Sequence, residues 1–496
     1  MDTPDMNKRQ SAWRRRWPLK SAVVAIAGLV AVAIWLGLNT TGCDPCASCA
    51  SMHSVTASPT PTSAPVRNSC QTSGALGVLV TKTDVDAYVP NGDFSGDIET
   101  GIQVVPIEGT SLPLVTIPTA STIIACSAND ETKEVVCVGL DNKVYLINGT
   151  SLTTTLTSAG SGEFFSSGGS CTNCNVLANA ATNQAFIGIA TQPSPSATPT
   201  GTAVRAPGNE PSSLNGHSDA AGITSGYQQL DLTGNTFGTP VEAQTTNISE
   251  SPALDPTRDL LLSASEDESG FPAGYQLYSY KGATPLVYDF LNTPPIFDPT
   301  DIEFDSAAID CSTGIALGTA EFTTEIMVVD TSKATFTVGT GGANGTWTAP
   351  AQLQDFPDFE TFFTAGMTGV AIAPDSHLAL LEDEFGTTGF GALQLPTTSG
   401  TGTPAVTDWV AANMPDDPSG AEWEMPLDPH GLTAYVSPTT KVAYGLLINL
   451  GRTYIAKINI AKLLAAPRTT TGGHIIDPTY DLVGNGVVTF ITMLGN

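Results

Sequence analysis

The stretch that decides the fold begins with Gly-Val-Ala-Ile-Ala at residues 369–373. It turns at Pro-Asp-Ser-His (374–377) and continues with Leu-Ala-Leu-Leu (378–381), which predicts two short strands paired as a hairpin. Two further strand candidates follow an acidic loop, at 391–395 and 405–410. Together they make a small four-stranded sheet whose faces one copy cannot bury, so the pattern requires neighbouring copies.

Similar units recur through most of the chain. A hairpin can be placed in each of seven copies, with turn formers at the reversal such as Asp-Pro-Thr-Arg-Asp (255–259) and Asp-Cys-Ser-Thr-Gly (310–314). Repeats of about 40–50 residues, each a four-stranded unit, favour a β-propeller over a sandwich. We therefore predict an all-β β-propeller, with seven four-stranded blades as the expectation and six or eight as alternatives. The predicted copies begin near residues 75, 122, 176, 252, 307, 369 and 432.

Three parts of the predicted ring depend on weaker patterns than the hairpins. The outer strand of the fifth copy is expected at 335–338. An apolar, β-branched segment at 487–493 is expected to be the outer or closing strand of the seventh. The third copy contains a Pro-, Ser-, Gly- and Thr-rich insertion at 191–225, which predicts a surface loop.

The N-terminus is first basic and then apolar. Residues 1–20 carry six Lys or Arg side chains, and residues 21–38 are uncharged. This run lies just within the about 17–25 residues that span a bilayer as a helix, and the positive flank places the N-terminus in the cytoplasm. Three interpretations stay open: an uncleaved signal anchor, a lipoprotein signal ending at Gly42-Cys43 with lipidation at Cys43, or a signal peptide cleaved to release a soluble protein.

The composition divides the chain into four parts. Residues 1–20 are a basic cytoplasmic segment, 21–38 a transmembrane anchor or signal segment, 39–66 a Cys-containing Ser/Thr/Pro tether, and 67–496 the propeller. We expect a bacterial, membrane-anchored protein that faces the periplasm or the cell exterior.

The chain is strongly acidic. Its formal net charge is −29, although the basic N-terminal segment contributes in the opposite direction. Such a surface repels nucleic acid and anionic lipid and could concentrate cations or cationic ligands. Nucleic acid is therefore excluded as a partner, and simple solubility is the alternative explanation of the charge.

Nine cysteines in an exported chain suggest disulfides. Cys126 and Cys137 lie roughly opposite each other on the two arms of one predicted hairpin, which predicts a cross-strand bridge. Cys171 and Cys174 form a second local pair. The remaining cysteines are a cluster at Cys43, Cys46 and Cys49, and two that stand alone, Cys70 and Cys311.

Acidic residues fall in loops that a propeller brings to one end of its channel. These are the loops that join second to third strands and those that join blades. The candidate metal ligands are Glu266, Asp267, Glu321, Glu382 and Asp383, with Asp305 just before a first strand. Hard oxygen ligands from several blades could hold Ca²⁺. The alternative is that acidic loops of an acidic protein are simply solvated.

Sequence motifs for catalysis are otherwise absent. The chain has no His-Glu-x-x-His, no Gly-x-Ser-x-Gly, no phosphate loop and no zinc-finger spacing. His430, in Asp428-Pro-His-Gly, precedes a first strand and is the histidine best placed for acid–base work, with Asp428 beside it. A structural histidine near a turn is the alternative.

One short motif points to a known family. Ala-Tyr-Val-Pro-Asn at 87–91 matches the Tyr-Val-x-Asn pattern that often ends the second strand in bacterial YVTN/lactonase-type seven-bladed propellers, which the predicted blades resemble. The resemblance covers residues 75 to about 493 as architecture. A lactonase-like hydrolase would need a metal or a histidine in the channel, for which His430 and Asp428 are the candidates.

Two functions follow as expectations. The first is a membrane-tethered, extracytoplasmic propeller that binds a protein, a glycan or an envelope component through its loop-rich face. The second is a lactonase-like or other metal-assisted hydrolase with a site at the central channel. The sequence offers no way to choose the ligand, because a fold does not carry a function.

Overall fold

A computed structural model describes the propeller region in segments, and the N-terminal parts predicted above lie outside the described residues. The described residues are 77–80, 84–91, 101–109, 115–121, 123–139, 143–158, 175–190, 225–238, 241–242, 252–265, 274–280, 286–289, 303–321, 323–337, 346–356, 359, 363, 367–383, 389–397, 403–414, 420, 432–448, 454–465, 474–475 and 480–483. Within these segments no helix is long and apolar enough to cross a membrane. The predicted span at 21–38, the insertion at 191–224 and the segment 487–493 are not among them.

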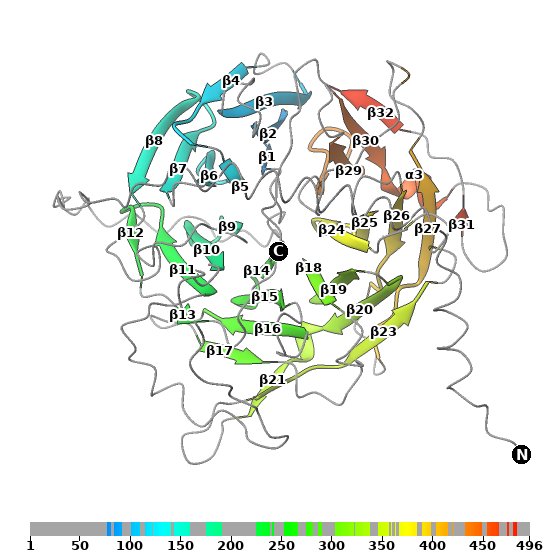
Figure 1. The fold of residues 1–496 in the computed structure, drawn as a ribbon. Coiled ribbons are helices and arrows are strands. Elements are labelled where there is room, and N and C mark those ends of the chain that lie inside the picture. Colours follow the sequence, from blue (N-terminus) through cyan, green and yellow to red (C-terminus); the bar gives the residue numbers. More distant parts are fainter. Residues whose placement is uncertain are drawn as a thin grey trace, which may run out of the picture. The chain divides into compact units, whose positions relative to one another are not determined.

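The described strands form seven sheets, one for each predicted copy, and the four strands of each blade are antiparallel (Figure 1). Blade one holds β1 (Gly77–Val80), β2 (Val85–Asn91), β3 (Gly101–Glu108) and β4 (Val115–Pro118). Blade two holds β5 (Ile123–Asn129), β6 (Glu134–Gly139), β7 (Lys143–Asn148) and β8 (Thr153–Ser158). Blade three holds β9 (Asn175–Asn179), β10 (Gln184–Ala190), β11 (Ser225–Asp231), and the short β12 (Thr236–Phe237) and β13 (Val241–Glu242).

The other four blades follow the same order. Blade four holds β14 (Ala253–Asp255), β15 (Leu260–Ser265), β16 (Gly274–Ser279) and β17 (Leu286–Asp289). Blade five holds β18 (Glu303–Asp310), β19 (Ile315–Glu321), β20 (Glu325–Asp330) and β23 (Ala351–Asp355), with the 3₁₀ turn η2 (Thr331–Lys333). Blade six holds β24 (Met367–Ala373), β25 (Leu378–Asp383), β26 (Gly389–Gln394) and β27 (Asp408–Asn413). Blade seven holds β28 (Leu432–Val436), β29 (Ala443–Ile448), β30 (Ile455–Asn459) and β32 (Tyr480–Val483), with the helix α3 (Ile460–Leu464).

The first strands of the blades contact one another in a closed cycle. The cycle runs β1, β5, β9, β14, β18, β24, β28 and back to β1. This confirms the all-β, seven-bladed β-propeller. We call the end of the ring that holds the turns between first and second strands the turn end, and the end where second strands run into third strands the loop end.

The outer strand of blade five differs from the prediction, and blade seven has its fourth strand before the segment 487–493, which lies outside the described residues. The outer strand of blade five is β23, which pairs with β20, and not the segment 335–338. That segment instead forms β21 (Thr335–Thr337), which pairs with β22 (Thr346–Thr348), and β22 adds in parallel to β17 of blade four. The outer strand of blade seven is β32, after β31 (His474–Ile475) has paired in parallel with β27 of blade six. Alternation alone identifies a strand but not its partner.

Every blade is buried on both faces. Along β25, Leu378 and Leu380 pack with blade seven, whereas Ala379 and Leu381 pack with blade five. Because successive side chains of a strand point to opposite faces, a sheet between two neighbours reads as a continuous apolar run. This accounts for the unbroken apolar patterns that the sequence shows in the hairpins.

Glycines allow large side chains of one blade to reach into the next. A Cβ on Gly318 of blade five would lie 1.6 Å from Oη of Tyr275 in blade four. The Tyr275 hydroxyl donates to the carbonyl of Ser306 in blade five at 3.2 Å. In the same way, a Cβ on Gly445 of blade seven would lie 2.2 Å from Cδ2 of Leu380 in blade six. These glycines are required by close approach between blades.

Five of the turns between first and second strands share one geometry. Each has four residues, at 130–133, 180–183, 256–259, 311–314 and 374–377. The last residue of each turn has a positive φ, between 54° and 81°. In the first four of these turns, the residue before the turn is a buried Asn or Asp whose side chain accepts the backbone N–H two residues on, at 3.0–3.1 Å. The turn formers noted in the sequence therefore satisfy their own backbone groups.

Glu108, at the end of β3, joins the first blade to the last. Its carboxylate accepts hydrogen bonds from Tyr435 Oη at 2.7 Å, Ser437 Oγ at 2.8 Å and Lys457 Nζ at 2.6 Å. The same ammonium lies 4.4 Å from the ring centroid of Tyr444. Burial alone would raise the pKa of Glu108, but the three hydrogen bonds and the charge of Lys457 outweigh it and lower this pKa.

Cys126 and Cys137 form a disulfide in the structure. They lie directly opposite each other on β5 and β6, with their Cα atoms 4.1 Å apart. The sequence placed these two residues correctly because both lie within one hairpin. Cys311, by contrast, does not stand alone as expected, since it too is disulfide-bonded.

Replacing Glu108 tests how much the seam between the first and last blades contributes. Glu108→Ala should lower the free energy of unfolding at pH 7 by about 2–4 kcal/mol, because it leaves Lys457 without its partner. Tyr435→Phe removes one hydrogen bond and should cost only about 1 kcal/mol. Urea unfolding measures both.

The pH dependence supplies the control. The lowered pKa means that the stabilisation by Glu108 is complete above the ordinary carboxyl pKa and is lost as the pH falls through the folded-state value. Glu108→Gln should therefore lose less stability in acid than the wild type does. Equal acid sensitivity of the two proteins would contradict this role of Glu108.

Candidate functional site

Many of the predicted site residues lie outside the described part of the chain. They are His430, Asp428, Glu266, Asp267, Cys43, Cys171 and Cys174. The catalytic pair at 428–430 and the second local disulfide therefore stay predictions. The four other carboxylates, Asp305, Glu321, Glu382 and Asp383, belong to described strands of blades five and six, which are neighbours in the ring.

Asp305 occupies a β-bulge at the loop end of blade five. Phe304 pairs with Ala320 and Ser306 pairs with Thr319, so Asp305 is the extra residue on β18. Blade six has an equivalent bulge on β24, between Met367 and Gly369. Bulges of this kind are common next to functional sites, where they change the direction of a side chain. Glu321 is the last residue of the partner strand β19.

Glu382 and Asp383 end β25 and are both buried, each 1% exposed. Because they are adjacent in a strand, their side chains point to opposite faces of the blade, Glu382 with Leu380 toward blade seven and Asp383 with Leu381 toward blade five. Gly369 pairs with Glu382, and a Cβ there would lie 2.5 Å from Cγ of Glu382. The glycine thus makes room for a buried glutamate.

These carboxylates do not form a metal site within the part of the chain that is described. No three His, Cys, Asp or Glu side chains there are close enough together to hold a metal ion. Glu382 and Asp383 cannot share one ion because their side chains point to opposite faces of the blade. A calcium site at the loop end therefore stays a prediction.

At the turn end, a set of polar contacts joins successive blades, and we call it the turn belt. It consists of the buried residues before the turns and their partners in the next blade. Asn129 donates to Asn183 Oδ1 at 3.0 Å, and Asn179 donates to Tyr280 Oη at 3.2 Å. The partner is in both cases a residue that sequence reasoning did not single out. The repeated Asn or Asp before each turn is the signal that could have identified the belt.

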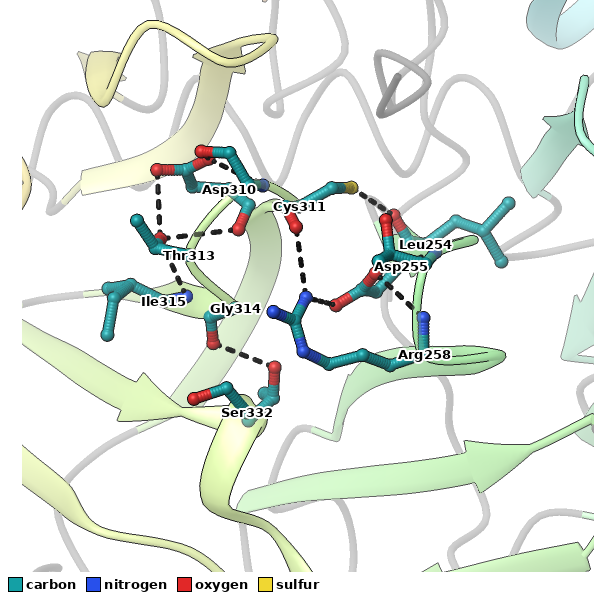
Figure 2. A network of polar contacts seen from close by, with 12 residues as sticks. Leu254, Asp255, Arg258, Asp310, Cys311, Thr313, Gly314, Ile315 and Ser332 are labelled. Atoms are coloured by element: carbon teal, nitrogen blue, oxygen red, sulfur yellow. Dashed lines mark hydrogen bonds and ion pairs between the residues drawn. The ribbon is translucent and has the colours of Figure 1, made fainter. Parts of the chain in front are cut away.

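The turn belt between blades four and five is shown in Figure 2. Arg258 Nη1 donates to Asp255 Oδ2 at 2.7 Å and to the carbonyl of Cys311 in the next blade at 3.0 Å. The Asp255 side chain is fully buried, and that of Arg258 is 23% exposed. Burial raises the pKa of Asp255, although the charge and hydrogen bond of Arg258 act in the opposite direction. The guanidinium is therefore needed to keep this carboxylate ionised inside the ring.

Between blades five and six, the belt brings together an Asp, a Ser and a His. Asp310 Oδ2 lies 2.5 Å from His377 Nδ1, and Ser312 Oγ lies 2.6 Å from Asp310 Oδ1. Ser312 Oγ is also 3.4 Å from the same nitrogen, Nδ1. A nucleophilic triad requires the Ser and the carboxylate on opposite nitrogens of the imidazole. Here both are on Nδ1 and the hydroxyl is bound to the carboxylate, so the cluster joins blades and does not activate Ser312.

No protein-family model matches the chain, and no curated protein matches it. Among solved structures, the chain is similar to the β-propeller domain of Cps50 (Swd1) from Myceliophteria thermophila, at 7% identity and a TM-score of 0.43, over 74% of this chain and 88% of that chain. The class of protein is therefore set by the sheet topology: a seven-bladed β-propeller. Nothing supports the YVTN/lactonase family specifically, and that resemblance holds for the architecture only.

Removing Arg258 tests the cross-blade belt. Arg258→Ala should destabilise the protein by about 3 kcal/mol at pH 7, because it leaves the buried Asp255 without its counterion. Lys333→Ala is a matched control, since Lys333 also pairs with a buried Asp three residues away but is 35% exposed. Its cost should be smaller than that of Arg258→Ala, because solvent screens the more exposed ammonium. Urea unfolding at several pH values measures both.

The sign of the pH effect follows from the raised pKa of Asp255. Because the pKa of Asp255 is higher in the folded state, ionisation of this carboxyl lowers the free energy of unfolding as the pH rises through that pKa. Loss of Arg258 makes this decrease larger, since the carboxylate then has no counterion. The deficit of Arg258→Ala should therefore shrink as the pH falls toward 4, and Asp255→Asn in the same chain should recover part of it. A deficit that does not depend on pH would exclude this explanation.

Proposed function

We propose that this protein is a membrane-tethered, extracytoplasmic binding scaffold of bacteria, and that its loop end holds a partner of the cell envelope. The partner that we favour is a protein with a basic surface. A glycan or another envelope component is the alternative. The observation that carries the proposal is the contrast between the two ends of the ring.

Around the channel, the turn end is closed by short and self-satisfied turns. Five of the described turns have four residues, and their polar groups bond within the turn or to the next blade. The connections at the loop end vary from three residues, at 140–142, to thirty-four, at 191–224. Variable connections on a rigid ring are where binding residues are usually found. Seven blades contribute such connections around one channel, and this favours contact with a large partner.

Charge favours a basic partner. The chain carries a formal net charge of −29, and Asp305 and Glu321 lie near the ends of strands that meet the loop end. Complementary charge raises the rate of association and suppresses wrong partners. The same charge makes nucleic acid and anionic lipid poor ligands for this end.

The location outside the cytoplasm is proposed on two grounds. The basic segment 1–20 before the apolar run 21–38 is the pattern of an inserted signal segment. The disulfide between Cys126 and Cys137 suits an oxidising compartment.

Site-specific photo-crosslinking tests the binding end. A benzophenone amino acid at Asn142 and at Thr387, in connections of blades two and six, should give the same protein adduct in cells. The same probe at the exposed positions Ser151 and Thr439, in connections at the turn end, is the matched control and should not. Raising the salt to 0.5 M in membranes should weaken the adducts, because screening reduces the attraction between charged surfaces. Adducts from the turn end alone would reject the proposal.

Fractionation of the full chain tests the tether. The wild type should remain in the membrane after carbonate extraction, and external protease should digest the propeller in spheroplasts. Two charges in the centre of the apolar run, Val30→Arg and Val32→Arg, should release the protein or abolish its export, since each costs about 2.5–3.5 kcal/mol at the middle of an inserted helix. Membrane retention by the double variant would contradict a tether at 21–38.

A further inference from the structure

Blade two carries its disulfide in the interior of the ring. Cys126 of β5 and Cys137 of β6 are each 0% exposed. Both side chains belong to an apolar cluster that also contains Tyr88 of blade one. The next residue along β5, Ser127, points the other way, because its hydroxyl accepts the backbone N–H of Ala178 in blade three at 2.9 Å. The disulfide therefore lies on the face of blade two that packs against blade one.

Blade one covers this face with its two inner strands. A Cβ added to Gly77 of β1 would lie 3.6 Å from Cβ of Cys126, so the strand passes directly beside the disulfide. Tyr88 of β2 is fully buried, and its hydroxyl donates to the carbonyl of Gly149 in blade two at 3.3 Å. The side chain of Leu79 fills the space beside the same glycine, since a Cβ there would lie 2.1 Å from its Cδ2. The two sulfur atoms are thus enclosed between the blades.

This enclosure restricts when the bond can form. A disulfide is made or broken by attack of a thiolate on a sulfur atom, through a mixed disulfide with a second molecule. That molecule would occupy the space that blade one fills, so the exchange requires blade one to be separated from blade two. The two cysteines are only 11 residues apart on the arms of one hairpin, and closing so short a loop needs no contact from another blade. Oxidation is therefore possible before blade one packs and is blocked afterwards.

The bond also fixes the register of blade two. Cys126 pairs directly with Cys137, next to the β-bulge between Ile123 and Ala125. A slip of one residue would turn the side chains of a strand to the opposite face of the sheet. The covalent link excludes such a slip while the hairpin still has no neighbours, and it keeps the apolar side chains of β5 and β6 aimed at blades one and three.

We infer that blade one closes over the disulfide between Cys126 and Cys137, and that a thiol oxidoreductase makes this bond on the open hairpin before blade one packs. The two thiols lose two protons and two electrons, and the disulfide of the oxidoreductase accepts them and becomes a dithiol. After closure, the bond is exchanged only when blade one separates from blade two. The presence of such an enzyme rests on the proposed location outside the cytoplasm, whereas the enclosure of the bond does not.

Reduction of the folded, full-length protein tests the enclosure. After treatment with dithiothreitol and alkylation, a non-reducing tryptic map detects the bond as peptide 83–133 joined to peptide 134–143, which contain only Cys126 and only Cys137. The native protein should lose this species at least about 100-fold more slowly than the protein unfolded in urea, because only the open fraction reacts. Equal rates would overturn the inference. The measurement needs no partner and no membrane, so its failure is distinct from a failure of the proposed function.

Two tyrosine variants identify the blade that must move. Tyr88→Phe removes the hydrogen bond from blade one to blade two and should make the reduction about fivefold faster, as expected for the loss of one hydrogen bond. Tyr275→Phe is the matched control, since Tyr275 is also buried and donates to the carbonyl of Ser306 across the junction of blades four and five. It should leave the rate unchanged. No acceleration in Tyr88→Phe, or the same acceleration in both variants, would show that blade one is not the cover.

Refolding of the reduced, full-length chain tests the order of events. Oxidised glutathione present from the start should give the joined peptides, whereas the same oxidant added after refolding should not. Resistance to thermolysin shows, before the late addition, whether the reduced chain has refolded. Joined peptides in equal yield after late addition to a refolded chain would overturn the proposed order. If the reduced chain stays unfolded, the comparison of Tyr88→Phe with Tyr275→Phe decides the inference, because it starts from the oxidised protein.

Discussion

Closure of the ring is the constraint on which the rest of the structure depends. Each sheet buries both faces against its neighbours, so blades one and seven are stable only if they meet. Among the described strands none is exchanged between these two blades, and the seam rests on side chains: an apolar cluster that includes Val85 and Tyr435, and the carboxylate of Glu108. Apolar faces supply most of the free energy of association but tolerate sliding. The three directed hydrogen bonds of Glu108 select one register.

The same division between apolar contact and directed contact recurs around the ring. The faces of the blades are apolar, and large side chains enter spaces left by Gly318 and Gly445. The turn belt adds polar contacts between successive blades, and its carboxylates Asp255 and Asp310 are fully buried. A buried carboxylate is destabilising unless it is paired and hydrogen-bonded. The belt satisfies this requirement with groups from the same turn and from the next blade. The contacts within the turn stabilise its conformation, and the contacts to the next blade fix the angle between the two blades.

The sequence predicted what depends on local pairing. The hairpins, the turns and the bridge from Cys126 to Cys137 all lie within short segments whose alternation and turn residues determine the register. It placed the outer strand of blade five at 335–338, because Thr-Phe-Thr is β-prone wherever it pairs. In the structure this segment pairs with β22 within the long connection from β20 to β23, and β23 is the strand that pairs with β20. For the candidate site, it identified Glu382 and Asp383 as acidic but placed them in a loop, whereas both belong to β25 and therefore face away from each other.

Residues that join blades were the least predictable, since His377 and Asp310 become neighbours only when blades five and six pack, and Lys457 and Glu108 only once the ring has closed. They look in sequence like ordinary turn and strand residues. Their placement nevertheless restricts where function can lie. The turn end has its polar groups committed to the ring, so changing them disturbs the angle between blades. Connections at the loop end join strands that are already paired on both sides, and their residues are free to vary without opening the ring. A propeller stabilised at one end in this way can acquire new ligands at the other.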